Sequence, residues 1–277
     1  MIEKPTTTSA ASTAFCAEKV EGPGGYLWVD GNGKITRDNG TLDQPKPNAF
    51  SLVHIDDCPQ STPTCRASCY VHGLERHAKT THDLYRHNSA FLRGELQFSA
   101  HISFKFRERE EWAKIMADWI SKNAAGGFRW HVSGDVFSAM YAYWIGRVCG
   151  LSPEVPQWVY TRSFSYLPIL AAASTLVGGN LAVNLSCDKD NYIEALRARH
   201  AIGLPLRLCY LTDDGTVPRH LPEDAVVFPD YKLRGGTSEG RAWFEALQPS
   251  HKRAVCPVDY HGKSEERRCG PCARCLT

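Results

Sequence analysis

The sequence has no hydrophobic run long enough to cross a bilayer, and its 277 residues carry a formal net charge of only +2. A membrane helix needs about 20 consecutive apolar residues. The near-neutral charge disfavours a broad phosphate-binding surface, although Lys252-Arg253 and Arg267-Arg268 are locally basic. Residues 1–14 are polar and lack the charged start and apolar core of a signal peptide. We therefore expect a cytoplasmic protein with no membrane partner.

Cysteine, in contrast, is abundant, with eleven residues in the chain. In a reducing compartment such a number favours metal binding over disulfides, and an odd count cannot pair completely. Hydrophobic residues make up 43% of the chain, which is enough for one domain of barrel size with additional segments.

Strand-like and helix-like segments alternate after residue 48. Strands are expected at 49–55, 128–132, 157–161, 181–186, 206–211 and 225–228, and helices at about 70–92, 107–123, 139–148, 166–176 and 191–200. This alternation predicts an α/β fold with a parallel sheet and right-handed crossovers. Six strands favour a partial, open six-stranded parallel β/α barrel, with an open doubly wound sheet as the alternative. In both folds, chemistry occurs at the carboxyl ends of the strands.

A β-hairpin is expected before the first of these strands. Asp30-Gly31-Asn32-Gly33 lies between the stretches 25–29 and 34–36, a pattern typical of hairpins. The predicted organisation is an N-terminal tail and hairpin over 1–48, the partial barrel over 49–235, and a C-terminal cysteine-rich extension over 236–277.

The first cysteine group, Cys58-x6-Cys65-x3-Cys69, lies in a loop directly after the first expected strand. Three thiolates can hold a [4Fe-4S] cluster and leave one iron without a protein ligand. A zinc site is the alternative, completed by one of the nearby histidines His54, His72 and His77. A third interpretation, in which the thiols act as small hydrophobic side chains, is disfavoured by the prolines and polar residues of the loop.

The second group, Cys256-x12-Cys269-x2-Cys272-x2-Cys275, is at the end of the chain. Bacterial ferredoxins use consecutive Cys-x2-Cys steps around a cubane cluster, whereas structural zinc sites more often use two separate pairs. Four ligands leave no open position. We therefore expect a second [4Fe-4S] cluster with a structural or electron-relaying role, and a zinc knuckle is the alternative.

The remaining cysteines have no ligand-like neighbours in the sequence. Cys149 ends a helical stretch and Cys209 lies inside a strand, so both are expected in the core. Cys187 is a weak candidate for a catalytic thiol because no base can be identified beside it. His131, on a strand, is expected to be a hydrogen-bonding core residue.

With an apolar first strand, a three-cysteine loop after it and Tyr70 after the last cysteine, the chain resembles the radical S-adenosylmethionine superfamily. The usual loop of that superfamily is Cys-x3-Cys-x2-Cys, so the spacing here is a variant. The segments His131-Val132-Ser133-Gly134-Asp135 and Tyr160-Thr161-Arg162, with the terminal cysteines, are similar to a phage-encoded family called gene product 88. We attach no activity to this second resemblance.

The first resemblance implies an enzyme in which the open iron chelates S-adenosylmethionine. One electron from the cluster would cleave the sulfonium and give a 5′-deoxyadenosyl radical, which abstracts hydrogen from an unknown substrate. An electron donor is then required as a partner. The protein would position the cofactor and exclude water.

The resemblance also assigns residues after the expected strands to S-adenosylmethionine. Gly134 permits close backbone approach and Asp135 would accept hydrogen bonds from the methionine ammonium, unless Asp135 caps the next helix. Arg162 would pair with the methionine carboxylate, unless it is a surface arginine. Four further cofactor-binding candidates are Asn184, Ser186, Asp188 and Tyr210. Asn184 and Ser186 would face the barrel interior if Val183 and Leu185 face the helices, and a polar core pair is their alternative.

Two other functions remain open at this point. A zinc-stabilised nucleic-acid-binding or replication-type protein would explain the terminal cysteines and the local basic stretches, although the total charge weighs against it. A non-catalytic iron–sulfur scaffold or sensor would keep the barrel without the cofactor chemistry.

Overall fold

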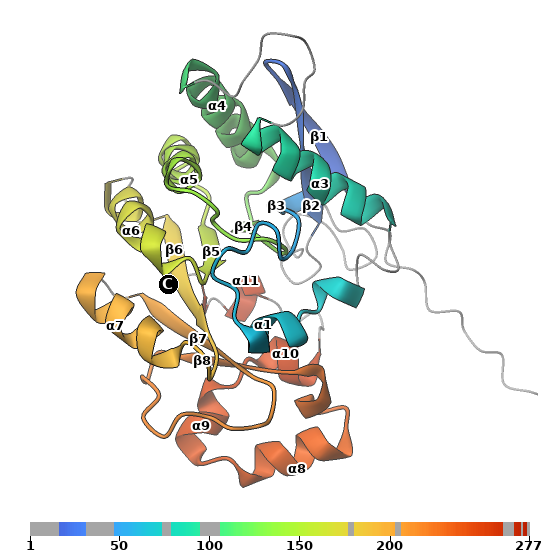
Figure 1. The fold of residues 1–277 in the computed structure, drawn as a ribbon, viewed down its shortest axis with the longest axis vertical. Coiled ribbons are helices and arrows are strands. Elements are labelled where there is room, and N and C mark those ends of the chain that lie inside the picture. The colour runs from blue at the N-terminus through green and yellow to red at the C-terminus, as the bar shows by residue number, and fades with distance from the viewer. Residues whose placement is uncertain are drawn as a thin grey trace, which may run out of the picture.

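The computed structural model describes residues 17–31, 47–73, 79–94, 106–176, 180–202, 206–262, 269–272 and 274–275. Its central element is one eight-stranded sheet whose strands follow each other in sequence order (Figure 1). The strands are β1 (Ala17–Gly22), β2 (Gly25–Gly31), β3 (Pro47–Phe50), β4 (Phe128–Trp130), β5 (Gln157–Thr161), β6 (Leu181–Cys187), β7 (Arg207–Thr212) and β8 (Val226–Pro229). The pairs β1–β2 and β2–β3 are antiparallel, and every pair from β3 to β8 is parallel. The sheet is open, with β1 and β8 at its edges.

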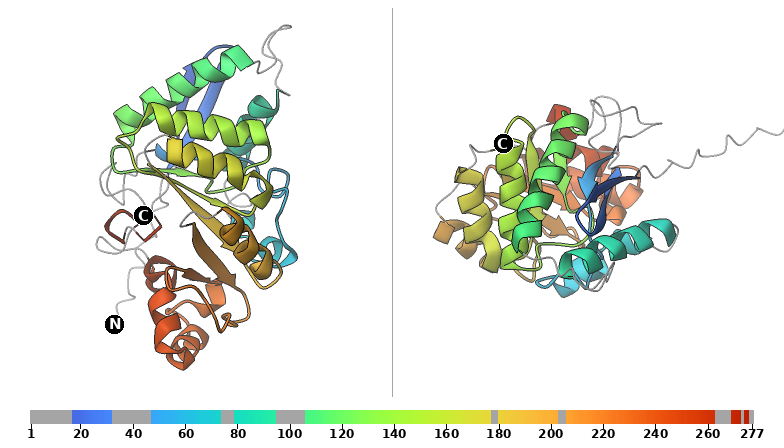
Figure 2. Two further views of the ribbon diagram at one scale, coloured as in Figure 1. Left: turned by 90° about the vertical axis from the view of Figure 1, so that its left-hand side faces the viewer. Right: turned by 90° about the horizontal axis from the view of Figure 1, so that it is seen from above.

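Helices cover the sheet unequally. The helices α4 (Phe106–Asn123), α5 (Ala139–Leu151), α6 (Leu167–Leu176) and α7 (Tyr192–Ile202) form a layer along one face (Figures 1 and 2). The short α1 (Pro63–Ala67) and the longer α3 (Lys79–Arg93) follow β3. After β8 come α8 (Ser238–Ala246), α9 (Pro249–Ala254), α10 (Pro257–His261) and α11 (Cys269–Cys272). None of the helices within the described ranges has the length and hydrophobicity that a bilayer crossing requires.

The two faces of the sheet differ because side chains alternate along each strand. Val183 and Leu185 of β6 belong to the main core beneath the helix layer. Asn184, between them, faces the other way, where its amide donates to the backbone oxygen of Cys275 at 3.1 Å. The helix-facing core includes contacting indoles, since the rings of Trp130 and Trp144 lie 5.7 Å apart. The opposite face is therefore the one that the C-terminal segment contacts.

The strand positions expected from the sequence are largely confirmed. The expected strand 157–161 has the bounds of β5, and the fifth and sixth strands are shifted by one residue at each end. The first two strands fit less well. β3 begins at Pro47 and ends at Phe50, so it shares only residues 49–50 with the expected strand, and β4 ends at Trp130 instead of residue 132. Residues 213–225 between β7 and β8 contain no helix. Within the expected helix 70–92, residues 71–73 and those of α3 from Lys79 are helical, and residues 74–78 lie outside the described part.

The first stretch of the predicted hairpin around Asp30-Gly31-Asn32-Gly33 lies in β2, and its second stretch, residues 34–36, lies outside the described residues. β2 pairs with β1 along residues 25–30 and with β3 through Asp30 and Gly31. The hairpin turn is Pro23-Gly24, where Gly24 has φ +75°. Proline followed by a glycine at positive φ is the combination that a tight type II turn requires. The N-terminal hairpin thus extends the same sheet as the parallel strands.

Candidate functional site

The loop that carries the first cysteine group lies over the carboxyl ends of β4 and β5. The backbone N–H of Leu52 donates to the oxygen of Ser133 at 2.9 Å, and that of Asp135 donates to the oxygen of Asp57 at 2.7 Å. On the next strand, the Gln60 side chain accepts from the Phe164 N–H at 2.8 Å. The cysteine loop is thereby fixed to the segments that follow two neighbouring strands.

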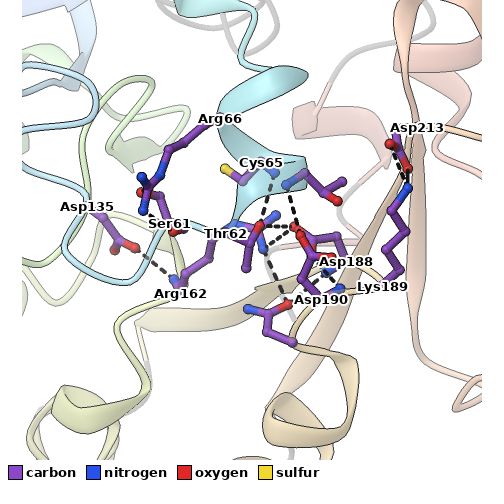
Figure 3. Close-up of polar contacts among 12 residues, drawn as sticks. Ser61, Thr62, Cys65, Arg66, Asp135, Arg162, Asp188, Lys189, Asp190 and Asp213 are labelled. Atoms are coloured by element: carbon purple, nitrogen blue, oxygen red, sulfur yellow. Dashed lines mark hydrogen bonds and ion pairs between the residues drawn. The ribbon is translucent and has the colours of Figure 1, made fainter.

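The helix α1, which contains Cys65, is anchored to the end of β6 (Figure 3). The Thr62 hydroxyl accepts from the Cys65 N–H at 3.0 Å as the helix N-cap and donates to Asp188 Oδ2 at 2.5 Å. Asp190 Oδ2 accepts from the Thr64 N–H at 2.9 Å. Threonine is a favoured N-cap residue, and a proline at the first helical position is equally typical. The sequence therefore forms this short helix locally, and two aspartates set its position.

The three thiols of the loop lie close enough to influence one another. All three cysteines are partly exposed. Burial raises the pKa of Cys58, and the charges of Asp135, Cys65 and Cys69 raise it further. Burial also raises the pKa of Cys65, which the nearby Arg162 guanidinium partly lowers. The loop therefore gathers three thiols beside one buried carboxylate and one buried guanidinium.

Asp135 is held by the segment after β5. Its Oδ2 accepts from the Arg162 N–H at 2.8 Å and its Oδ1 from the Val136 N–H at 2.6 Å. Burial raises the pKa of this carboxyl. The alternative in which Asp135 caps the next helix is wrong, because the N-cap of α5 is Ser138. Glycine is required at the preceding position, since Gly134 has φ +78° and a Cβ there would lie 2.5 Å from Leu52 Cβ.

Arg162 and Asp188 form a buried ion pair with Nη1 and Oδ2 2.7 Å apart. The side chains are 7% and 0% exposed, so the surface-arginine alternative is wrong. A second contact joins Arg162 to Asn191 Oδ1 at 3.4 Å. The structure thus brings together the predicted residues Gly134, Asp135, Arg162 and Asp188 beneath the cysteine loop.

Two buried hydroxyls in the same region have no hydrogen-bond partner among the described residues. They are Ser133 Oγ after β4 and Ser163 Oγ after β5. Their exposed fractions are 3% and 0%. Buried hydroxyls are normally hydrogen-bonded, so these two are available to a polar ligand. The sequence analysis had not assigned a role to either, although both follow strands at the predicted edge.

The other predicted cofactor residues lie elsewhere. Asn184 contacts the C-terminal segment, and Ser186 is partly exposed on the same face of β6. Tyr210 packs in the helix-facing core, where its ring meets that of Tyr192 with centroids 5.7 Å apart. Burial raises the pKa of Tyr210 to about 12. The structure does not bring these three residues to the cysteine loop.

The histidines near the first group contact each other. His54 Nε2 and His72 Nδ1 are 3.0 Å apart, and His72 Nε2 is 3.1 Å from the Arg66 oxygen. His77 lies outside the described residues. As expected, His131 is a core residue, hydrogen-bonded to Tyr141 OH at 2.8 Å, and burial lowers its pKa to about 3.

The terminal cysteines pack against the sheet face that the helices leave free. Cys256 is the N-cap of α10, and Cys269 and Cys272 are the ends of α11. Cys256 and Cys275 share an apolar cluster with Cys209 of β7. A hydrogen bond from Cys209 lowers the pKa of Cys275. The prediction that Cys209 is buried is confirmed, but its neighbours are the tail cysteines.

Within the described ranges, no group of three or more His, Cys, Asp or Glu side chains is arranged tightly enough to hold a metal ion. The four sulfurs around a single zinc ion each lie about 2.3 Å from it and are therefore close together. In an iron–sulfur cluster each thiolate binds a different iron, so the sulfurs stand farther apart.

Comparison with known proteins identifies one family. The model of a family described as Gene product 88 matches residues 26–277. The Gene 88 protein of Mycobacterium phage L5 is 31% identical over 134 residues, which are 48% of this chain and 53% of that protein. The match therefore spans about half the length of that relative. No solved structure matches this chain.

Proposed function

The chain belongs to the Gene product 88 family, and we propose that it is an iron–sulfur enzyme of the radical S-adenosylmethionine type. In this proposal Cys58, Cys65 and Cys69 hold a [4Fe-4S] cluster with one open iron. The observation that carries the proposal is the anchoring of their loop over the carboxyl ends of consecutive parallel strands. The six parallel strands from β3 to β8 are in sequential order, as a partial β/α barrel would have them.

The residues present suit such a cluster and a polar cofactor. The three thiols are partly exposed, so a centre that they hold is open to a small molecule. The hydroxyls of Ser133 and Ser163 are buried without hydrogen-bond partners among the described residues. A bound polar group would supply the hydrogen bonds that they lack. When bound, the cluster supplies one electron to S-adenosylmethionine, whose reductive cleavage yields methionine and a 5′-deoxyadenosyl radical. The electron comes from a separate donor.

The side chains around the loop have positioning roles. Gly134 lets the chain after β4 approach Leu52 closely, and Asp135 is oriented by two backbone N–H groups. The Arg162 guanidinium is paired with Asp188, so we assign it to holding the loop through Asp188 and Thr62. The same guanidinium places a positive charge beside Cys65, which favours the thiolate that iron requires.

Metal analysis tests the proposal first. Protein purified without oxygen should be brown and contain iron with a comparable amount of sulfide. In Cys65→Ala iron per chain should fall, whereas Cys149→Ala, which removes a buried thiol from the helix layer, should not change it. A colourless protein with stoichiometric zinc would contradict the proposal and support a zinc-stabilised nucleic-acid-binding protein.

A product assay then separates an enzyme from a scaffold. The chemically reduced protein is incubated with S-adenosylmethionine and analysed for 5′-deoxyadenosine. We expect product from the wild-type protein and none from Cys65→Ala. If the iron-loaded wild type gives no product and calorimetry detects no binding of S-adenosylmethionine, the enzyme assignment is wrong and a non-catalytic iron–sulfur scaffold remains.

A further inference from the structure

The sheet face opposite the helix layer is partly open. Five neighbouring strands each place a partly exposed side chain on it, and these are Arg129 of β4, Tyr160 of β5, Ser186 of β6, Leu211 of β7 and Phe228 of β8. Arg129 faces this side because its neighbours Phe128 and Trp130 lie in the main core beneath the helices. A ligand that reaches this face would therefore meet one positive charge among these five side chains.

The Arg129 side chain leans toward the carboxyl ends of the strands. Arg129 is in register with Trp158, but its guanidinium lies over the ring of Tyr160, 4.8 Å from the ring centroid. Its Nε donates to the backbone oxygen of His131 at 3.1 Å. These two contacts orient the guanidinium. Its terminal nitrogens, Nη1 and Nη2, form no hydrogen bond or ion pair with any described residue.

Arg129 differs in this respect from other arginines of the chain. Four of them each form an ion pair with a carboxylate, and the pairs are Arg93–Asp57, Arg147–Glu110, Arg162–Asp188 and Arg199–Asp224. The charges of Asp30 and Asp259 act on Arg129 through space, but neither carboxylate forms an ion pair with it. Removing a positive charge from water is costly when no anion is paired with it. An anionic ligand would supply that partner.

The residue that holds Arg129 also connects it to the cysteine loop. His131 has φ +62°, which is uncommon for a residue other than glycine and occurs preferentially at functional sites. Its backbone oxygen accepts from Arg129, and the next oxygen along the chain, that of Val132, accepts from the Tyr70 hydroxyl. Tyr70 directly follows Cys69 in the sequence. The guanidinium and the first cysteine group are therefore fixed to the same two-residue segment.

We propose that Arg129 binds an oxyanion, a carboxylate or a phosphate, of the substrate that reacts at the cysteine loop. A guanidinium presents parallel N–H groups that match two oxygens of such an anion, and the Tyr160 ring keeps its plane oriented. The other candidate for this role, Arg162, is already paired with Asp188. The identity of the anion as a substrate rests on the proposed function, whereas binding at Arg129 requires neither iron nor S-adenosylmethionine.

Arginine-specific labelling of the whole wild-type chain tests the site. Phenylglyoxal reacts with guanidinium groups, and peptide mass spectrometry measures the labelling rate of each arginine separately. The rate is measured without additive and with inorganic phosphate, benzoate or the neutral benzamide, at one low ionic strength because salt screens charges. Arg241 is the internal control, since it is exposed and its side chain also makes one hydrogen bond, to the Gly235 oxygen at 3.2 Å.

Phosphate or benzoate should slow the labelling of Arg129 and leave that of Arg241 unchanged, and benzamide should protect neither. Protection by phosphate alone identifies a phosphorylated substrate, and protection by benzoate alone identifies a carboxylate.

Calorimetry with the protecting anion measures the contribution of the guanidinium. Arg129→Gln should bind that anion at least about 10-fold more weakly, the loss expected from one charge-assisted hydrogen bond. Arg129→Lys keeps the charge without the planar fork and should also bind more weakly than the wild type. Arg241→Gln should bind as the wild type does. Protection is measured on the wild-type protein, so it decides the question even if an Arg129 variant does not fold.

Unchanged labelling of Arg129 in the presence of both anions overturns the inference. Equal protection of Arg129 and Arg241 also overturns it, because the anions then only screen surface charge. If S-adenosylmethionine protects Arg129 and the two anions do not, the guanidinium serves the cofactor and its assignment to a substrate is wrong. These results do not depend on iron content or on 5′-deoxyadenosine formation, which test the proposed function separately.

Discussion

Arg162 and Asp188 are joined by a buried ion pair whose carboxylate also accepts the hydroxyl hydrogen of Thr62. The three residues come from the end of β5, the end of β6 and the N-cap of α1. One carboxylate therefore connects two strands of the sheet to the helix that carries Cys65. The position of the first cysteine group depends on this connection.

Asp188→Asn should destabilise the protein strongly. The change leaves the Arg162 guanidinium buried without its charged partner, and breaking a buried pair in this way costs about 3–5 kcal/mol. Urea unfolding monitored by circular dichroism measures the loss. The loosened α1 should also lower the iron retained by the protein after gel filtration.

Asp213→Asn is the matched control for this change. Asp213 pairs with Lys189, whose side chain is 43% exposed, so solvent screens the interaction. We expect unfolding of this variant to match the wild type. Equal stability of the Asp188 and Asp213 variants would show that the buried pair does not hold the loop.

Thr62→Val should reduce both stability and iron content. The variant loses the N-cap of α1 and the hydrogen bond to Asp188, and loss of a threonine cap alone costs about 1 kcal/mol. Thr237→Val removes an equivalent cap, since Thr237 accepts from the Gly240 N–H at the start of α8. We expect that control to lower stability without changing iron per chain. A similar iron loss in both variants would contradict a specific role for Thr62.

Much of the fold and part of the site were predictable from the sequence. Apolar strands bounded by turn residues were located to within a few positions, and β5 was placed without error. Because carboxyl ends of parallel strands meet at one edge, Asp135, Arg162 and Asp188 were expected near one another, and they are. The hairpin that joins β1 to β2 at Pro23-Gly24 was not predicted, because the sequence analysis did not identify β1 as a strand.

The remaining site features depend on long-range packing. A lone cysteine in a strand has the same sequence signature whether it packs in a core or meets other thiols. Cys209 acquires its neighbours only when the tail folds onto the sheet. Tyr210, one position later, faces the helix layer instead. Because side chains alternate along β7, Cys209 and Tyr210 face opposite sides of the sheet. The sequence alone does not show which residues each of them contacts.

Gly134→Ala should be poorly tolerated, because Gly134 has φ +78° and a Cβ would lie 2.5 Å from Leu52 Cβ. The left-handed conformation costs about 1–2 kcal/mol and overpacking adds about 1–3 kcal/mol. At Gly236 a Cβ would meet no atom within 4 Å, so Gly236→Ala should unfold at nearly the wild-type urea concentration. If Gly134→Ala unfolds there too, the close packing of the cysteine loop on this segment is not required.

Asp30 should make stability depend on pH. It is 1% exposed, accepts from Ser51 Oγ at 3.0 Å and from Tyr85 OH at 3.2 Å, and burial raises its pKa from 3.8 to about 7. The folded state therefore holds a proton that the unfolded chain releases near pH 4. Its contribution to stability is fully present below pH 4 and is lost as the pH rises toward 7.

Asp30→Asn removes this titration while keeping an oxygen that accepts a hydrogen bond. The difference in unfolding free energy between the variant and the wild type should grow in favour of the variant from pH 5 to pH 8, by about 2.6 kcal/mol. Asp118→Asn, at an exposed position of α4, should show no such trend. Because other groups titrate equally in both proteins, only the difference between them reports on Asp30. A difference that stays constant across this range would show that Asp30 is ionised in the folded protein.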